Sequence, residues 1–329
     1  MSYPNEQDLY GNFEFTEDNH IKYWYGNDQT KIFRTDEWES TTGTVGFCRR
    51  PRLTFRGELI RTSRILSRKH DIMNVFFSGG LDSEIALNAW IESRAPFRPV
   101  IVRFKDDLNQ GDVVQAVSFC QERNLDFVTI DFDPMRFYES GEWQRIARDY
   151  QSYTFYQQIL LKIAEDFAQP MITIDEVELE KVPDMDRLIK TGEMHLDWVF
   201  LKKEDQDGVW RRFVAKTGIP AYNNFYTYNP ETMLAFLEGY VVNRLITDQI
   251  PGKLGWTSSK NEIYGTLTRY PFKPRPKRTG VEKLFHVWTD VEYQCANLLF
   301  ATEPRIYEFD AKQLIKNMKE GRTSKCKTI

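Results

Sequence analysis

One short run of small and polar residues, SGGLDS at Ser78–Ser83, holds several groups that could do chemistry together. It directly follows the apolar segment IMNVFF and directly precedes a helical pattern. Two adjacent glycines let backbone N–H groups approach an anion closely, and the N-terminus of a helix attracts negative charge. Ser78 and Ser83 add hydroxyl donors. The string therefore predicts a phosphate-binding loop.

The carboxylate in this string indicates a divalent cation as well. Asp82 alone would repel phosphate, whereas a carboxylate beside phosphates is a common way to hold Mg2+. Asp175 ends another largely apolar segment, PMITID, and Glu176 follows it. We expect them to lie near Asp82 as metal ligands or beside the metal. Glu178 and Glu180, in the same acidic run, are equally well explained as a solvated loop.

These residues need a scaffold that brings the ends of several strands together. Four apolar segments, IMNVFF, RPVIVRF, DFVTIDF and PMITID, alternate with helical patterns of about a dozen residues. Such alternation predicts an α/β fold, a parallel sheet with helices on both faces and IMNVFF at its centre. Ligands of such sheets bind at the carboxyl ends of the strands, where both polar runs begin.

The rest of the chain divides by composition. Residues 1–54 predict a small β-rich or irregular accessory segment, residues 55–250 the domain with the loop, and residues 251–329 a basic loop with a mixed, mainly helical extension. Within them, NPETMLAFLEGYVVNRLITDQ predicts one long helix capped by Asn229. We expect the stretch from Pro251 to Gly280 to be loop and the tail KEGRTSKCKTI to be disordered.

Composition limits the function classes. The 329 residues carry a formal net charge of −4, which gives no overall attraction to nucleic acid. Four cysteines without a C-x-x-C pair argue against a zinc site, a disulfide framework and sulfur transfer. The four histidines are scattered and lack metal-site spacing. No apolar run reaches membrane-spanning length, so we expect a cytoplasmic protein without a membrane partner.

The string SGGLDS after an apolar strand resembles the PP-loop of the N-type ATP pyrophosphatase superfamily, whose fold is of the adenine nucleotide alpha hydrolase type. Other phosphate motifs, G-x-x-x-x-G-K-[ST] and G-x-G-x-x-G, are absent from the sequence. The resemblance covers about residues 55–240 and is closest in layout to the synthetase domain of the asparagine synthetases. The stretches VRFKDD, ITIDEVE and YTYNPETMLAFL carry it beyond the loop.

The resemblance implies a role for each matching residue. Ser78, Gly79, Gly80, Leu81 and Ser83 would bind the pyrophosphate part of ATP, and the backbone from Val102 to Phe104 would meet the adenine. Asp82, Asp175 and Glu176 would hold Mg2+. Asp82 and a lysine would act in catalysis by neutralising the departing pyrophosphate. The candidate lysines are Lys105 and Lys253, with Lys260 a further one.

The implied activity is that of an ATP-dependent ligase. ATP would be cleaved to AMP and pyrophosphate to activate a carboxylate or amide, which an amine or ammonia then attacks. The opening 54 residues are too few for a glutaminase domain, so we expect no glutamine-derived ammonia from this chain. The alternatives are a PP-loop enzyme that modifies a nucleobase or nucleic acid, and a non-catalytic nucleotide-binding protein on the same scaffold.

One segment suggests a further partner. Residues 252–288 carry eight Lys or Arg side chains with Trp256, Tyr264, Tyr270 and Phe272 interleaved. Basic and aromatic side chains together suit single-stranded nucleic acid. The same stretch also suits a bound substrate or a Pro-rich arm on a neighbouring subunit of a homo-oligomer.

Overall fold

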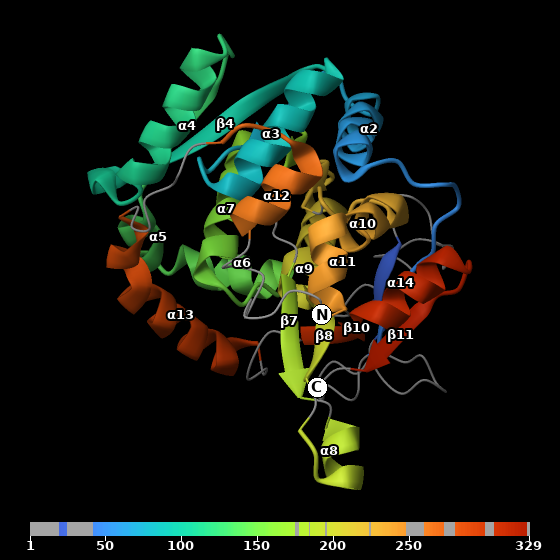
Figure 1. The fold of residues 1–329 in the computed structure, drawn as a ribbon. Helices are drawn as coiled ribbons and strands as arrows, with labels where there is room; N and C mark the ends of the chain where they lie inside the picture. Colours follow the sequence, from blue (N-terminus) through green and yellow to red (C-terminus); the bar gives the residue numbers. More distant parts are fainter. Residues whose placement is uncertain are drawn as a thin grey trace.

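A computed structural model describes residues 20–24, 42–174, 178–183, 185–194, 196–223, 225–247, 260–272, 280–299 and 306–327. Its centre is a parallel sheet in the order β5-β4-β3-β6-β9, with helices on both sides (Figure 1). The strands are β3 (Met73–Phe76), β4 (Phe97–Phe104), β5 (Val128–Phe132), β6 (Met171–Ile172) and β9 (Ala221–Tyr222). The predicted α/β fold is confirmed, with IMNVFF in the middle strand.

Alternate residues of the central strands supply two separate cores. In β3, Val75 packs into one hydrophobic cluster and Phe76 into the other, and all four residues of the strand are buried. A strand covered on both faces has to be largely apolar on both, which is why Asn74, bonded to the Pro170 carbonyl at 2.8 Å, is the one polar residue of this segment. The two clusters thus hold two layers of helices against one sheet.

The helices divide between these two clusters. The first cluster includes side chains of α2 (Phe55–Ser67), α3 (Leu81–Ser93), α4 (Gln110–Glu122), α10 (Pro230–Leu237), α11 (Tyr240–Ile246), α12 (Lys260–Thr268) and α14 (Ala311–Lys319). The second includes side chains of α5 (Pro134–Glu139), α6 (Glu142–Tyr150), α7 (Phe155–Phe167), α9 (Glu204–Thr217) and α13 (Phe285–Leu298). No helix among the described residues is long and apolar enough to cross a membrane.

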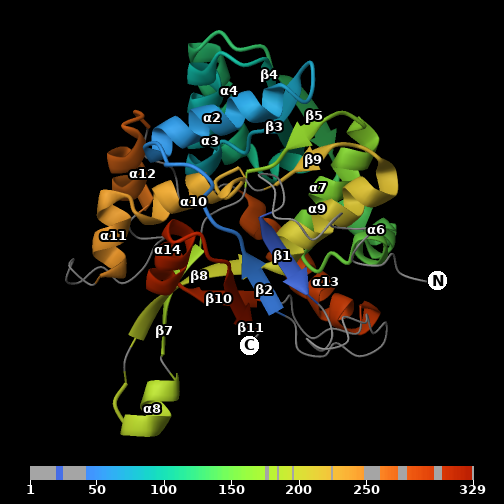
Figure 2. The same cartoon turned by 90° about the vertical axis from the view of Figure 1, so that its right-hand side faces the viewer.

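Two antiparallel sheets lie below the central one (Figure 2). One has the order β10-β8-β7, from β7 (Glu178–Pro183), β8 (Leu196–Lys203) and β10 (Ile306–Asp310). Its β7–β8 hairpin carries α8 (Met185–Thr191), which projects from the body of the protein. The other has the order β1-β2-β11, from β1 (Ile21–Trp24), β2 (Thr42–Val45) and β11 (Ser324–Lys327). The boundaries at residues 54 and 250 stay a prediction, although both outer segments share this last sheet.

The structure corrects three local predictions. The long helix predicted from Asn229 is two helices, α10 and α11, separated at Gly239, where a Cβ would lie 2.3 Å from a Leu267 methyl carbon of α12. The predicted loop from Pro251 to Gly280 contains α12. The expectation of a disordered tail is wrong for β11, which pairs with β2. The Asn229 cap is confirmed, since its side chain accepts from the Thr232 N–H at 2.8 Å.

The pairing of β11 predicts that the tail stabilises the protein. Deleting residues 324–329 should lower the free energy of unfolding by about 2 kcal/mol, because a few net backbone hydrogen bonds are lost. The buried Ser324 side chain, bonded to Asn317 at 3.1 Å, is lost with them. Urea denaturation measures the change, with deletion of residues 328–329 as the control. Equal stability of the two truncated proteins would contradict the prediction.

Candidate functional site

The glycine loop between β3 and α3 is shaped by the approach of α4. Gly79 has φ +81°, a left-handed conformation that glycine adopts without strain. A Cβ at this position would lie 2.3 Å from the Asp112 carbonyl oxygen and 3.1 Å from the Ala116 nitrogen, both in the backbone of α4. Gly80, at φ −72°, is the N-cap residue of α3. The first glycine is therefore required by backbone shape and by space.

The two serines brace this loop from within. The Ser83 hydroxyl donates to the Gly80 carbonyl at 3.0 Å and lies 3.0 Å from the Ser78 hydroxyl. The Gly80 N–H donates to the Ser78 Oγ at 3.2 Å. Ser83 is buried and Ser78 is exposed. The loop thus holds its hydroxyls in place before any ligand arrives.

A cavity of about 100 Å³ opens at the carboxyl ends of the central strands, as the sequence predicts. It is lined by Phe76, Phe77, Ser78, Ser83, Val100, Val102, Phe104, Asn109, Asp112, Tyr156, Leu160, Thr173, Ile174 and Val281. Ser78 and Ser83 therefore share one cavity with the predicted adenine contacts Val102 and Phe104. Gly79, Gly80 and Leu81 form the turn beside it.

Several lining residues were not found by sequence reasoning. Thr173 lies in the predicted fourth strand, and its place at a strand end could have indicated it. Asn109 and Asp112 stand at the start of α4, opposite the loop. Tyr156 comes from α7, whose helical pattern alone does not show which face meets the cavity.

Asp82 does not line this cavity. Its carboxylate accepts from Lys260 Nζ at 3.0 Å and from the Tyr264 hydroxyl at 2.6 Å, both on α12. The Tyr226 hydroxyl donates to the Asp82 carbonyl oxygen, and the rings of Tyr226 and Tyr264 stack with centroids 5.7 Å apart. The side chains of Asp82 and Lys260 are only 23% and 13% exposed. In this structure the carboxylate ties the loop to α12.

The structure describes only some of the other predicted metal ligands and lysines. Asp175, Glu176 and Lys253 lie outside the described residues. Within the described part of the chain, no group of three or more His, Cys, Asp or Glu residues is arranged to hold a metal ion. Lys105 pairs with Asp133 at 3.0 Å, and this hydrogen bond raises its pKa. The metal and catalytic assignments stay predictions, and the described lysine bonded to the loop residue Asp82 is Lys260.

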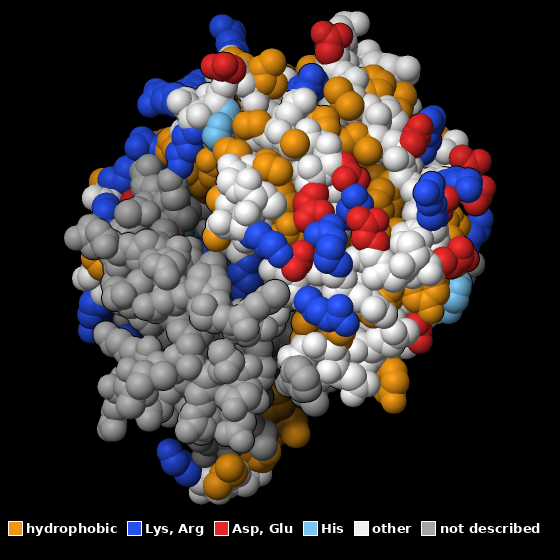
Figure 3. Space-filling view, turned by 180° about the vertical axis from the view of Figure 1, so that it is seen from behind, with side chains coloured by type: hydrophobic (Ala, Val, Ile, Leu, Met, Phe, Trp, Pro, Cys, Tyr) orange, Lys and Arg blue, Asp and Glu red, His pale blue; other side chains and the backbone are white. Residues whose placement is uncertain are grey.

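Two aromatic residues of the basic segment pack in the interior of the protein. Tyr264 and Tyr270 are buried, and Tyr270 donates to Glu92 at 2.6 Å. Neither ring is available for base stacking, while Trp256 lies outside the described residues. On the face opposite to that of Figure 1, basic and acidic side chains are interspersed over the described surface (Figure 3). Nucleic-acid binding by residues 252–288 stays a prediction.

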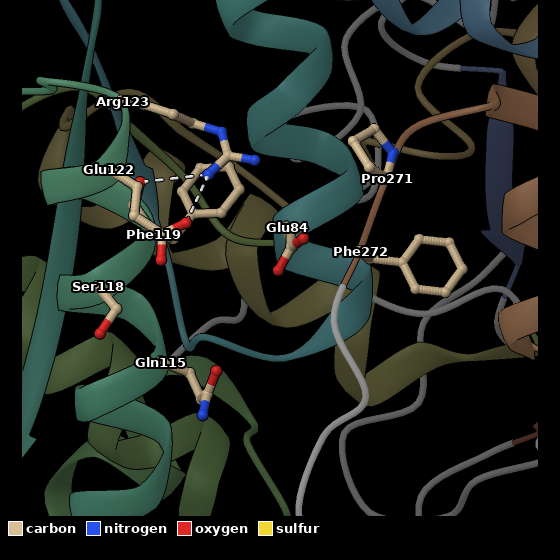
Figure 4. Close-up of a pocket in the computed structure, with 8 residues that line it drawn as sticks. All are labelled: Glu84, Gln115, Ser118, Phe119, Glu122, Arg123, Pro271 and Phe272. Carbon is tan, nitrogen blue, oxygen red and sulfur yellow. Dashed lines mark hydrogen bonds and ion pairs between the residues drawn. The ribbon is translucent and has the colours of Figure 1, made fainter.

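A second cavity opens between α3, α4 and the chain after α12 (Figure 4). Glu84, Gln115, Ser118, Phe119, Glu122, Arg123, Pro271 and Phe272 line it. The Arg123 guanidinium lies over the Phe119 ring, 3.7 Å from its centroid. This cavity shares no lining residue with the loop cavity, so we give it no part in the loop chemistry.

Two of the four thiols are poorly suited to sulfur chemistry. Burial raises the pKa of Cys120 to about 12 and is the main cause that raises the pKa of Cys48 to about 12. Both side chains therefore stay protonated near neutral pH, and a protonated thiol is a weak nucleophile. The expectation that the chain does not transfer sulfur stays a prediction.

Fold and site together define an α/β protein with a glycine loop and a cavity at the carboxyl ends of parallel strands. No family model matches the chain, and no curated protein matches it. Among solved structures it is similar to a predicted subunit of tRNA methyltransferase from Methanocaldococcus jannaschii. The identity is 14%, the TM-score 0.28, and the match covers 50% of this chain and 73% of the other.

Two synthetases also show similarity. NMN synthetase from Francisella tularensis is 13% identical, with 73% of this chain and 94% of that one covered and a TM-score of 0.28. The NH3-dependent NAD synthetase from Campylobacter jejuni is 10% identical, with 75% and 94% covered and a TM-score of 0.28.

Proposed function

We propose that this protein binds ATP at the glycine loop and cleaves it to AMP and pyrophosphate, activating a carboxylate or amide for attack by an amine or ammonia. One observation carries the proposal. The hydroxyls of Ser78 and Ser83, which flank the left-handed turn at Gly79, line one cavity together with Val102 and Phe104 of β4. A loop for phosphates thus lies next to a backbone edge that can bond a base.

The loop suits pyrophosphate as a leaving group. The N–H groups at the start of the 13-residue helix α3 lie at the positive end of its dipole. Donors preorganised around a departing charge lower the barrier because they need no reorganisation during the reaction. Ser78 and Ser83 are braced in this way by their mutual contact. The protein's part is to bind and orient the leaving unit.

Mg2+ is part of the proposal. Asp112 lines the cavity, and carboxylate oxygens are ligands that Mg2+ prefers. Asp112 would hold the ion together with the predicted ligands Asp175 and Glu176, and Asp82 would join them after leaving Lys260. The ion would neutralise charge on the phosphates. Lys260, partly buried beside the loop, is the lysine we assign to the same task.

The substrate class within this activity is an acid or amide, as in an asparagine synthetase-like ligase. A second candidate is a nucleotide-binding protein without catalysis. It is favoured by one observation: the Asp82 carboxylate is held by Lys260 and Tyr264 and does not face the cavity.

Product analysis tests the proposal. The protein is incubated with ATP, Mg2+, ammonia and a panel of carboxylic and amino acids, and nucleotides are separated by chromatography. We expect AMP and pyrophosphate in equal amounts with the right acceptor, and no ADP above background. ADP as the main product would contradict the mechanism, and binding without cleavage across the panel would favour the second candidate.

A further inference from the structure

The β4 edge at the loop cavity is left open by the neighbouring strand. β3 ends at Phe76, and the last bond to β4 runs from the Phe77 N–H to the Val100 carbonyl at 2.8 Å. In a strand, every second residue points its N–H and C=O to the same side. Val102 and Phe104 therefore direct these groups toward the loop, beyond the end of β3. Within the described sheet, Val102 and Phe104 are paired with residues of β5 and not with β3.

A side chain of the same chain bonds this edge. Asn109 Nδ2 donates to the Val102 carbonyl at 2.8 Å, and Asn109 Oδ1 accepts from the Phe104 N–H at 2.8 Å. The residue is 8% exposed and lines the loop cavity. One carboxamide thus satisfies both the acceptor and the donor that the strand leaves open.

The position of Asn109 makes this use of its side chain unusual. It is the N-cap residue of α4, where asparagine ordinarily accepts from an N–H of the first turn, and yet it makes no such bond. Other caps in the protein do, on α2, α5, α10 and α14. The Asn109 carboxamide therefore bonds the strand edge instead of the N–H groups of its own helix.

The chemistry of this contact matches one edge of a nucleobase. A carboxamide presents an N–H beside an acceptor oxygen, and adenine presents its 6-amino N–H beside the acceptor N1. Either pattern fits the pair formed by the Val102 carbonyl and the Phe104 N–H. The two cannot occupy the edge together.

We propose that Asn109 gates the base subsite of this cavity: its carboxamide occupies the hydrogen-bonding edge when the site is empty and withdraws when adenine binds. This inference rests on the proposed function. The withdrawn amide has an alternative partner, because first-turn N–H groups of a helix lack intrahelical acceptors. A site that is open only part of the time binds its ligand more weakly by the fraction that is open.

Two separate probes test the gate and the loop. Adenosine carries the base without phosphates, and pyrophosphate carries the phosphates without the base. In Asn109→Ala the edge is free, so adenosine should bind roughly tenfold more tightly by calorimetry, while pyrophosphate binding stays unchanged. Asn88→Ala is the matched control, since Asn88 is an asparagine of α3 bonded to the Glu84 carbonyl and does not line the cavity.

Asn109→Asp guards against a folding defect of the alanine variant. A carboxylate can still accept from the Phe104 N–H, but it cannot donate to the Val102 carbonyl and is repelled by that oxygen, so its hold on the edge is weakened. At the N-cap a carboxylate suits the start of α4. Tighter adenosine binding in this variant as well supports the gate. Unchanged or weaker adenosine binding in the folded variants overturns it, although pyrophosphate binding by the wild type would leave the proposed function standing. Loss of pyrophosphate binding in the wild type itself would overturn both.

Discussion

Gly79→Ala is expected to destabilise the protein by about 3 kcal/mol or more and to abolish pyrophosphate binding. Part of the loss is the left-handed backbone, at φ +81°, which costs about 1–2 kcal/mol for a residue with a Cβ. The rest arises because that Cβ would lie 2.3 Å from the Asp112 carbonyl oxygen. Backbone atoms of α4 cannot turn away as a side chain can, so the helix has to shift.

Two other glycines separate these contributions. Gly141 has φ +71° with nothing within 4 Å of an added Cβ, so Gly141→Ala should show the backbone cost alone, about 1–2 kcal/mol. Gly80 has an ordinary φ, and its added Cβ meets only the Ser78 hydroxyl at 3.2 Å, so Gly80→Ala should fold nearly as well as the wild type. Urea denaturation measures the folding stability of each variant, and calorimetry measures its pyrophosphate binding. A Gly79→Ala protein as stable as Gly141→Ala would show that α4 does not press on the loop.

Asp82→Asn is expected to cost about 1.5–3 kcal/mol of folding stability, because it removes the charge-assisted hydrogen bond that the largely buried Lys260 ammonium makes to the carboxylate. The Tyr264 bond can persist to the amide oxygen. Adding Lys260→Met removes the ammonium that made this bond, so the double variant should be less destabilised than the sum of the single ones. A coupling of about 1–2 kcal/mol in this cycle would identify the pair as a structural tie between the loop and α12.

The same variants test the metal role of Asp82 through an independent measurement. ATP binding is measured with and without Mg2+ in each protein. If the carboxylate serves only as a metal ligand, Asp82→Asn keeps the wild-type unfolding curve and loses the Mg2+ dependence. That pattern would contradict the structural tie. If Asp82→Asn loses both folding stability and the Mg2+ dependence of ATP binding, the carboxylate exchanges Lys260 for the ion.

The local features of this protein were predictable from its sequence because they depend on neighbours in the chain. IMNVFF became the central strand since a strand covered on both faces must be largely apolar on both. The Asn229 cap followed from Asn-Pro before an apolar helical pattern. The loop itself needs only six consecutive residues, two of which are glycines, so its place between β3 and α3 could be inferred without the tertiary structure.

The partners of the loop were decided by the tertiary structure alone. Lys260 and Tyr264 reach Asp82 from 178 and 182 residues away, on a helix that lay within a predicted loop. The sequence predicts Asp82 as a metal ligand and offers Lys260 only as a further candidate lysine, since nothing local indicates that the two side chains meet. A charged side chain takes the partner that packing brings within reach, and packing joins segments that no local pattern connects.

The sequence by itself determined an α/β sheet, a glycine loop after its central strand and the strand end that faces the loop. Which side chains fill that space was decided by the fold, as Asn109 shows. Its local preference is to cap α4, but β3 stops short of the end of β4 and leaves two backbone groups open beside it. A buried, unpaired backbone group is costly, so the amide bonds the strand edge and leaves the helix uncapped.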